Sequence, residues 1–200
     1  MDATVTEADG SFRAGVLRRL QAAADLGSVQ EVVRTAARRL ADADGATFVL
    51  RDGDKCFYAD EDAMSPLWKG QRFPLTNCIS GWAMMHAQTV VVSDITLDER
   101  IPIEAYRPTF VRSLAMVPIG GERPVAAIGV YWAQLHAATA DELEALHALA
   151  DAAGDAIARI GLVGAPVLPD LAGAGAAAVD PVDRPGQATR PNADRERIAR

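Results

Sequence analysis

The chain has 200 residues, enough for one domain of ordinary size with tails but too few for a complete two-domain enzyme. Its formal net charge of -7 argues against a nucleic-acid partner, because phosphate binding requires a clustered basic surface. No apolar stretch approaches the roughly 20 residues of a membrane span, and the polar N-terminus is unlike a secretory signal. We therefore expect a cytoplasmic protein that binds neither membrane nor nucleic acid, with both cysteines reduced.

Composition divides the chain into a domain and two tails. Residues 164–200 contain five of the eleven prolines and no aromatic residue, so they bury too little apolar surface to offset the entropy of ordering. We expect this tail to be disordered, and residues 1–10 likewise. Residues 11–163 remain as the expected domain.

Two helices are predicted at the start of this domain. The first runs from Ser11, a good capping residue, to Leu26, and Gly27 suits its C-terminal cap. The second begins at the capping box Ser28–Glu31. Its apolar residues recur on one helical face, which is typical of a helix that covers a sheet.

The rest of the domain predicts an antiparallel sheet. The strands 46–51 and 55–60 flank Asp52-Gly53, a turn dipeptide in which glycine permits a positive φ. The elements expected after them are an irregular stretch over 61–77, a helix over 79–86, a strand over 90–93, a loop with a short helix over 94–110, a hairpin of 113–119 and 125–132, and a helix from 139 to about 162. This order predicts an α+β fold with helices packed on the sheet.

The element order and several motifs resemble those of GAF domains, the small-molecule sensing modules of bacterial signalling proteins. The resemblance covers residues 22–162 and rests on Ser65-Pro-Leu-Trp68-Lys-Gly70, Cys78-Ile-Ser-Gly-Trp82-Ala, Asp94-Ile, Asp98-Glu-Arg-Ile-Pro102, Tyr106-Arg-Pro108 and Ser113-Leu-Ala-Met-Val-Pro-Ile119. It implies a GAF/PAS-like fold, with the N- and C-terminal helices on one face and a lid of loops and short helices on the other. The sequence is similar to the GAF domains of sensor histidine kinases, but departs from such kinases after residue 162, so we expect a stand-alone sensor or an input domain.

The resemblance places a ligand pocket between the sheet and the segments 67–82 and 94–112. Ten residues are candidates to line it: Tyr58, Trp68, Phe73, Cys78, Trp82, Asp94, Tyr106, Phe110, Arg112 and Met116. Most are aromatic or apolar, and the alternative for these is a place in the core. Arg112 in an apolar strand requires an anion, either Asp94 or a ligand carboxylate, unless it forms a plain surface salt bridge.

The function implied by the resemblance is a sensor without catalytic activity, which binds an unknown small molecule and signals to a partner such as a sensor kinase or response regulator. The alternative is a thiol-dependent reductase of a small oxidised metabolite, similar to the GAF enzymes that reduce free methionine sulfoxide. Those enzymes share a Gly-Val-Cys-Gly turn and a later Cys-Asp, which Cys56 and Cys78 do not match. No cofactor is expected, because neither cysteine precedes a histidine as in bilin-binding relatives and the three histidines are too scattered for a metal site.

The last helix predicts a homodimer formed through the terminal helices. A capping box at Thr139–Glu142 sets its start. Apolar residues then recur in steps of three and four, as in a helix seam: Leu143, Leu146, Ala150, Ala153, Ile157 and Ile160. The first helix adds Val16, Leu17, Leu20 and Ala24. The alternative is that this stripe packs on the sheet of its own domain.

Overall fold

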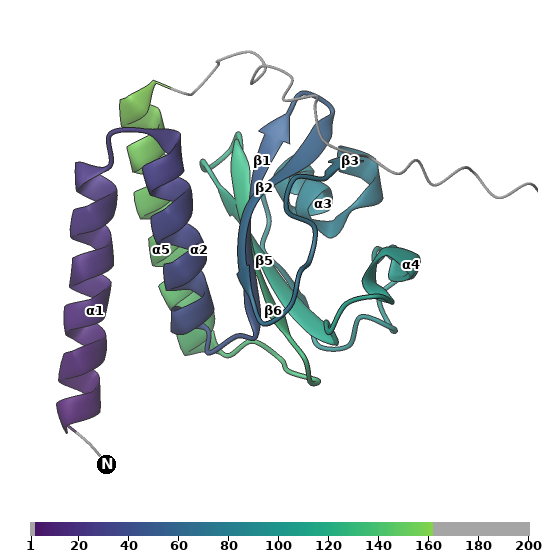
Figure 1. Ribbon diagram of the computed structural model, residues 1–200, viewed down its shortest axis with the longest axis horizontal. Helices are drawn as coiled ribbons and strands as arrows, with labels where there is room; N and C mark the ends of the chain where they lie inside the picture. Colours follow the sequence, from purple (N-terminus) through teal and green to yellow (C-terminus); the bar gives the residue numbers. More distant parts are fainter. Residues whose placement is uncertain (1–2, 162–200) are drawn as a thin grey trace, which may run out of the picture. The chain divides into compact units, whose positions relative to one another are not determined.

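The computed structural model describes residues 3–161, which form an antiparallel sheet between two layers of helices and loops (Figure 1). The elements are α1 (Ala3–Ala22), α2 (Leu26–Leu40), β1 (Gly45–Asp52), β2 (Lys55–Ala63), β3 (Arg72–Pro74), the 3₁₀ turn η1 (Leu75–Asn77), α3 (Ile79–His86), β4 (Val90–Val92), α4 (Ile103–Tyr106), β5 (Ser113–Ile119), β6 (Ala126–Trp132) and α5 (Ala140–Ile160). The strand order is β3-β2-β1-β6-β5-β4, with every neighbouring pair antiparallel. The predicted α+β fold, with its terminal helices and its lid on opposite faces, is confirmed.

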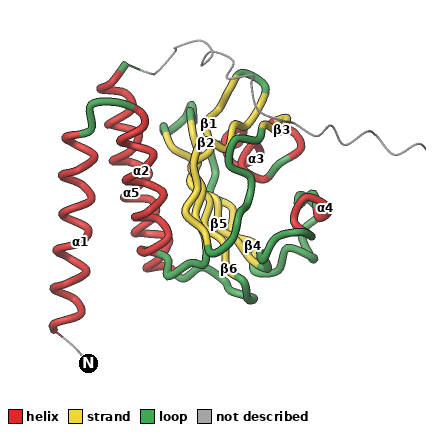
Figure 2. The backbone as a smooth tube through the Cα atoms, viewed as in Figure 1, coloured by secondary structure: helices red, strands yellow, loops and turns green. Residues whose placement is uncertain are grey.

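The helical layer consists of α2 and α5, which pack on the sheet, and α1, which packs on both of these helices (Figure 2). Val29 and Val33 of α2 share one apolar cluster with Phe48 of β1 and Leu146 of α5. Full burial of a side chain of this size contributes about 1.5–3 kcal/mol relative to exposure, so this cluster holds the helices on the sheet.

The N-terminal helices begin elsewhere than the sequence predicts. α1 starts at Ala3, so residues 3–10 are helical although composition predicts a disordered segment there. α2 is capped by Asp25, whose carboxylate accepts a 2.7 Å hydrogen bond from the Ser28 amide. Gly27 therefore lies in the first turn of α2, and the predicted capping box at Ser28 is wrong, because an aspartate three residues earlier is an equally good cap.

The apolar stripe of α5 packs on the sheet of its own domain. Leu146, Ala150, Ala153 and Ile157 are each at most 3% exposed and belong to the cluster that joins the helices to the sheet. The spacing that predicts a dimer seam is thus explained within one chain. The capping box at the start of α5 is confirmed, with the Thr139 hydroxyl accepting from the Glu142 amide at 3.3 Å.

A β-bulge in β2 decides which of its side chains face the lid. The register with β1 shifts at Ala59, an extra residue between Tyr58 and Asp60. Tyr58 belongs to the apolar cluster on the lid face, whereas Asp60 forms a 2.6 Å ion pair with Arg34 of α2 on the helical face. Strict alternation would place Tyr58 and Asp60 on the same face, so the bulge separates the cavity from the charged surface.

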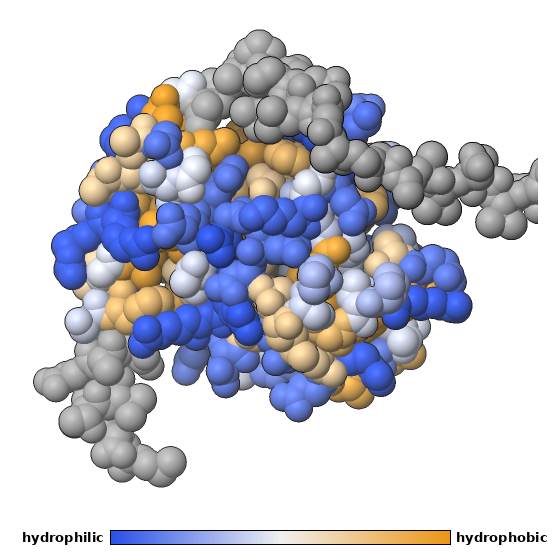
Figure 3. Space-filling view, viewed as in Figure 1, coloured by the Kyte–Doolittle hydropathy of each residue, from blue (hydrophilic) through white to orange (hydrophobic). Residues whose placement is uncertain are grey.

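Charged side chains tie α2 to β2 at the surface. Asp60 also contacts the Lys69 ammonium at 2.6 Å, and Arg38 of α2 pairs with Asp62 at 2.6 Å. Figure 3 shows hydrophilic residues across the middle of this face, over α2 and the strands beside it. These partly exposed pairs fix the orientation of α2 more than they add stability.

Arg159 joins the ends of the two terminal helices. Its guanidinium donates hydrogen bonds to the carbonyl oxygens of Leu20 and Ala23 at 2.9 and 3.1 Å. The last carbonyls of a helix have no intrahelical donor, so this cation caps α1 from α5.

No helix within residues 3–161 is both long and apolar enough to cross a bilayer. The tail predicted over 164–200 lies outside the described residues, as does the predicted domain limit at 163.

Candidate ligand-binding site

A small cavity lies on the lid face of the sheet, where β2 and β3 meet α4 and the segment that leads into α3. Its volume is about 80 Å³, and its lining residues are Tyr58, Trp68, Phe73, Asn77, Cys78, Pro102, Ala105 and Tyr106. Sites for drug-sized ligands measure about 300–1,000 Å³, so this cavity suits a molecule of only a few non-hydrogen atoms. Five of the ten predicted residues line it, whereas Asn77, Pro102 and Ala105 are additions from the same segments.

Trp68 is the centre of the aromatic residues around this cavity. Its ring lies edge-on to three tyrosines, with centroid distances of 5.5 Å to Tyr58, 4.8 Å to Tyr106 and 5.6 Å to Tyr131. Its Nε1–H group donates to the Ala105 carbonyl at 3.3 Å. Edge-to-face pairs contribute about 0.5–1.5 kcal/mol each beyond their area burial, so Trp68 joins β2, α4 and β6 in one cluster.

Glu61 of β2 holds the loop that carries Trp68. Its carboxylate oxygens accept hydrogen bonds from the backbone amides of Leu67, Trp68 and Lys69, at 3.1, 2.9 and 2.9 Å. Hydrogen bonds to an ionised acceptor are about twice as strong as neutral ones. One side chain therefore fixes this wall of the cavity.

The polar groups in the cluster are hydroxyls and thiols. The Tyr58 hydroxyl is hydrogen-bonded to the Ser80 hydroxyl at 3.1 Å, and the Ser80 hydroxyl also donates to the Cys78 sulfur at 3.4 Å. Burial raises the pKa values of Tyr58 and Tyr106, and the neighbouring phenols and the Cys78 sulfur raise them further. Both phenols are therefore neutral at physiological pH.

The two cysteines are buried neighbours with free thiols. The neighbouring Cys56 thiol lowers the pKa of Cys78 to about 7, and Ser80 and Gly81 contribute in the same direction against the opposing effect of burial. The same contact, together with burial, raises the pKa of Cys56. Cys78 is thus the acidic member of the pair.

None of the described residues that line the cavity carries a formal charge, apart from the ionisable Cys78. An ion without a partner of opposite charge loses several kcal/mol of hydration when it is buried. The four aromatic rings of the lining offer apolar contact, and the phenols offer hydrogen bonds. This chemistry suits an uncharged molecule.

Asp94 and Arg112 do not line the cavity, and Arg112 does not enter an apolar strand as predicted. Arg112 precedes β5 and its side chain is exposed. The Asp94 carboxylate accepts hydrogen bonds from the hydroxyl and the amide of Thr96 at 2.6 and 2.9 Å. These bonds lower the pKa of Asp94, and the charge of Arg112 adds only the smallest contribution. Asp94 and Arg112 therefore lie outside the cavity, and their binding of an anion stays a prediction.

Three other candidates lie outside the cavity. Trp82 is half-buried on α3, stacked on His86 at 4.1 Å and covered by the Arg100 guanidinium at 4.6 Å from its ring centre. Met116 is fully buried, and Phe110 is half-buried, both in the lid-side cluster. Met116 and Phe110 therefore pack in the lid-side core and do not line the cavity, which is the alternative that the sequence leaves open for the apolar candidates.

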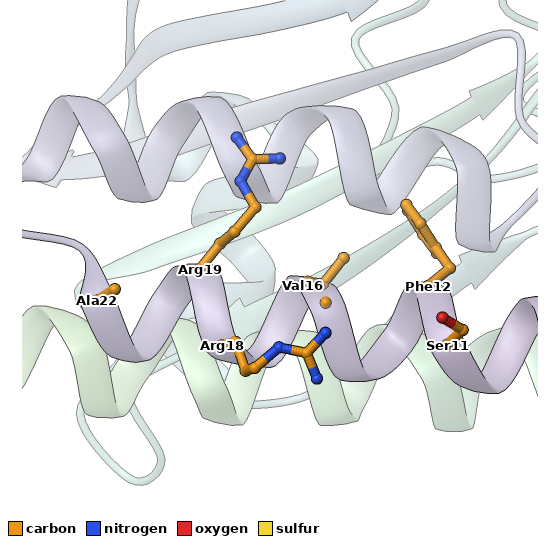
Figure 4. A pocket seen from close by; sticks show the side chains of 7 residues that line it. Ser11, Phe12, Val16, Arg18, Arg19 and Ala22 are labelled. Carbon is orange, nitrogen blue, oxygen red and sulfur yellow. The ribbon is translucent and has the colours of Figure 1, made fainter.

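A larger hollow of about 570 Å³ runs along α1 (Figure 4). The described residues that line it all belong to this helix: Ser11, Phe12, Gly15, Val16, Arg18, Arg19 and Ala22. Phe12 and Arg19 extend toward α2, where they contact Arg39 and Glu31. Side chains from a single helix do not surround a ligand, so the cavity at Trp68 is the better candidate.

A family model for the GAF domain matches residues 23–158. The chain belongs to the GAF family. The predicted resemblance is therefore confirmed, and the cavity at Trp68 lies within the matched residues. Among curated proteins, no sequence matches this GAF protein.

The GAF domain superposes on solved structures of low sequence identity. The GAF domain of an Acinetobacter phosphoenolpyruvate-protein phosphotransferase is 14% identical with a TM-score of 0.66, and the match covers 77% of this chain and 95% of that one. The GAF domain of a two-component sensor histidine kinase from Bacillus halodurans is 18% identical with a TM-score of 0.60, over 72% and 100% of the two chains. The free methionine-R-sulfoxide reductase of Neisseria meningitidis is 18% identical with a TM-score of 0.63, over 76% and 89%.

At such identities these structures share the fold with this chain and nothing further. The likeness to the sulfoxide reductase therefore does not favour thiol-dependent reduction as the function.

Proposed function

We propose that this GAF domain is a sensory domain that binds a small, uncharged molecule in the cavity at Trp68 and signals to a partner protein. The observation that carries the proposal is the lining of the cavity, which combines four aromatic rings with phenol hydroxyls and without a cationic or carboxylate side chain. Concave, mostly apolar sites with a few polar groups are the usual form of small-molecule sites. The partner is a component of bacterial signal transduction, such as a sensor kinase or a response regulator, and the location is cytoplasmic.

The size of the cavity limits the ligand. Sites for drug-sized molecules measure about 300–1,000 Å³, several times more than the space here. A larger ligand requires movement of the loop that Glu61 holds, or of the single-turn helix α4. Either movement displaces Trp68, which is hydrogen-bonded to α4 through the Ala105 carbonyl.

The proposal is tested with pairs of small probes that differ in charge. Acetamide and acetate have nearly the same shape, and acetone adds a second neutral probe of the same size. We expect acetamide and acetone to shift the NMR signal of the Trp68 indole N–H, with affinities in the millimolar range for such small molecules. Acetate at the same concentration should leave that signal unchanged.

A cavity-filling variant supplies the control. Ala105→Leu places three additional carbons at the cavity, whereas Ala158→Leu makes the same change at an exposed position of α5. We expect loss of the probe response in the first variant and its retention in the second. An equal response in both variants, or a response to acetate that matches acetamide, contradicts the proposal.

A further inference from the structure

The fold brings Cys56 and Cys78 together beneath the cavity. Cys56 lies in β2 and is fully buried, and it pairs with Phe73 of β3 in the sheet. The chain then passes through η1 to Cys78, which precedes the first residue of α3 and lines the cavity. Both cysteines belong to the buried lid-side cluster, and the Cys78 thiol donates at 3.5 Å to the carbonyl of Pro74, the residue next to Phe73 in β3.

Two donors beside Cys78 favour its thiolate, whereas the protonated thiol donates to the Pro74 carbonyl at 3.5 Å. The Ser80 hydroxyl donates to its sulfur at 3.4 Å, and the Gly81 amide in the first turn of α3 is a further donor. The other titratable groups around it are Cys56, Tyr58, Tyr106 and Tyr131, and the pKa values of all four are raised. These groups stay protonated, so no neighbouring anion opposes the thiolate, and thiolates are the reactive form of cysteine.

The cavity selects which molecules reach the sulfur. Cys78 is 8% exposed, and the space beside it measures about 80 Å³. Hydrogen peroxide has two non-hydrogen atoms and is little larger than water, so it fits into a space of this size. A bulky aromatic hydroperoxide does not.

We propose that Cys56 and Cys78 form an oxidant-responsive dithiol, in which hydrogen peroxide enters the cavity and oxidises the pair to a disulfide. The Cys78 thiolate attacks one peroxide oxygen and breaks the O–O bond, giving a sulfenic acid and hydroxide, which takes up a proton to become water. The Cys56 thiol then attacks the Cys78 sulfur, the S–OH bond breaks, and a second water leaves. Two thiols lose two electrons in total, and one peroxide is reduced to two waters. This role is independent of the ligand proposed above.

The disulfide would join β2 to the first turn of α3. In the reduced form, Ser80 of that turn is hydrogen-bonded to both Cys78 and Tyr58. A disulfide at Cys78 changes the sulfur that accepts the hydrogen bond from Ser80. Oxidation therefore alters the wall of the cavity.

The experiment treats the full chain with equimolar hydrogen peroxide, unfolds it in the presence of N-ethylmaleimide, and measures the intact mass. For the wild type we expect a species without maleimide that has lost two hydrogens. Cys56→Ser should accumulate a sulfenic acid that dimedone traps at Cys78. Cys78→Ser should retain a thiol that maleimide labels fully.

Two measurements on the wild type keep the proposal testable if a variant does not fold. The rate at which hydrogen peroxide oxidises the wild type should rise about tenfold between pH 6 and pH 8 and level off above pH 8. This follows because the fraction of Cys78 present as thiolate depends on its pKa, which is about 7. Cumene hydroperoxide should react far more slowly than hydrogen peroxide. Full maleimide labelling of the peroxide-treated wild type, or equal rates with both peroxides, overturns the proposal.

Discussion

Tyr131 and Trp132 are consecutive residues of β6 whose side chains lie on opposite faces of the sheet. Tyr131 packs edge-on against Trp68 in the lid-side cluster, with 5.6 Å between the ring centroids. Trp132 donates from Nε1 to the carbonyl of Ala41, the C-terminal cap of α2, at 3.2 Å. A displacement of Trp68 therefore reaches the helical layer through two adjacent residues of one strand.

Trp132→Phe should weaken this connection without changing the cavity. The phenyl ring keeps the apolar contact, but the buried Ala41 carbonyl loses its indole donor, which costs about 1–3 kcal/mol of unfolding free energy. Urea denaturation measures the loss. In the same variant, acetamide should still shift the Trp68 indole signal while its effect on the Ala41 amide falls. Retention of both effects would contradict the route through β6.

The strongly patterned elements could be predicted from the sequence. The helix expected over 79–86 is present as α3 with the same bounds, and the strand over 113–119 as β5. The hairpin of β1 and β2 is also present, although the turn residues are Gly53 and Asp54. In these segments the local signals agree with one another: β-branched runs, a turn dipeptide and short apolar helices.

The missed features depend on contacts that no local pattern encodes. The bulge at Ala59 turns Tyr58 toward the cavity and Asp60 toward α2, and the alternation of residues in β2 gives no sign of it. Arg112 looks buried in an apolar run but lies just before β5, at the surface. The stripe of α5 has the spacing of a helix seam, and that spacing also suits a helix that packs on a sheet.

Glu61→Gln should loosen the wall of the cavity. An amide group retains one acceptor oxygen, so it no longer satisfies all three amides of residues 67–69. We expect a loss of about 1–3 kcal/mol in unfolding free energy and faster hydrogen exchange at Trp68. Asp62→Asn is the matched control, because it removes a partly exposed ion pair with Arg38 and should cost less than about 1 kcal/mol. Unchanged exchange at Trp68 in Glu61→Gln would show that another contact holds the loop.

The ion pairs of Asp60 predict an acid-sensitive contribution to stability. Burial raises the pKa of Asp60, but the hydrogen bond from Lys69 and the charge of Arg34 outweigh it, so the pKa of Asp60 in the folded protein is below its ordinary value. A depressed carboxyl pKa contributes stability that is complete above the unfolded pKa and disappears as the pH falls through the folded pKa. The difference in thermal midpoint between the wild type and Asp60→Asn should therefore be largest near neutral pH and shrink below about pH 4. A constant difference down to pH 3 would contradict this assignment.

Ile157→Glu separates the two interpretations of the stripe on α5. Ile157 is 2% exposed within the cluster that joins α5 to the sheet. A carboxylate buried there lacks a partner, and the isoleucine contacts are lost as well, so the domain should lose about 3–5 kcal/mol or fail to fold.

The neighbouring Ala158 is exposed and supplies the control, since Ala158→Glu should leave the unfolding free energy within about 0.5 kcal/mol of the wild type. Denaturation is followed together with light scattering, which reports the oligomeric state of each protein. If Ile157→Glu gave a well-folded monomer from a dimeric wild type, the stripe would be a seam between chains. Its burial against the sheet predicts the opposite result, a loss of folding at an unchanged oligomeric state, because Ile157 packs against residues of its own domain.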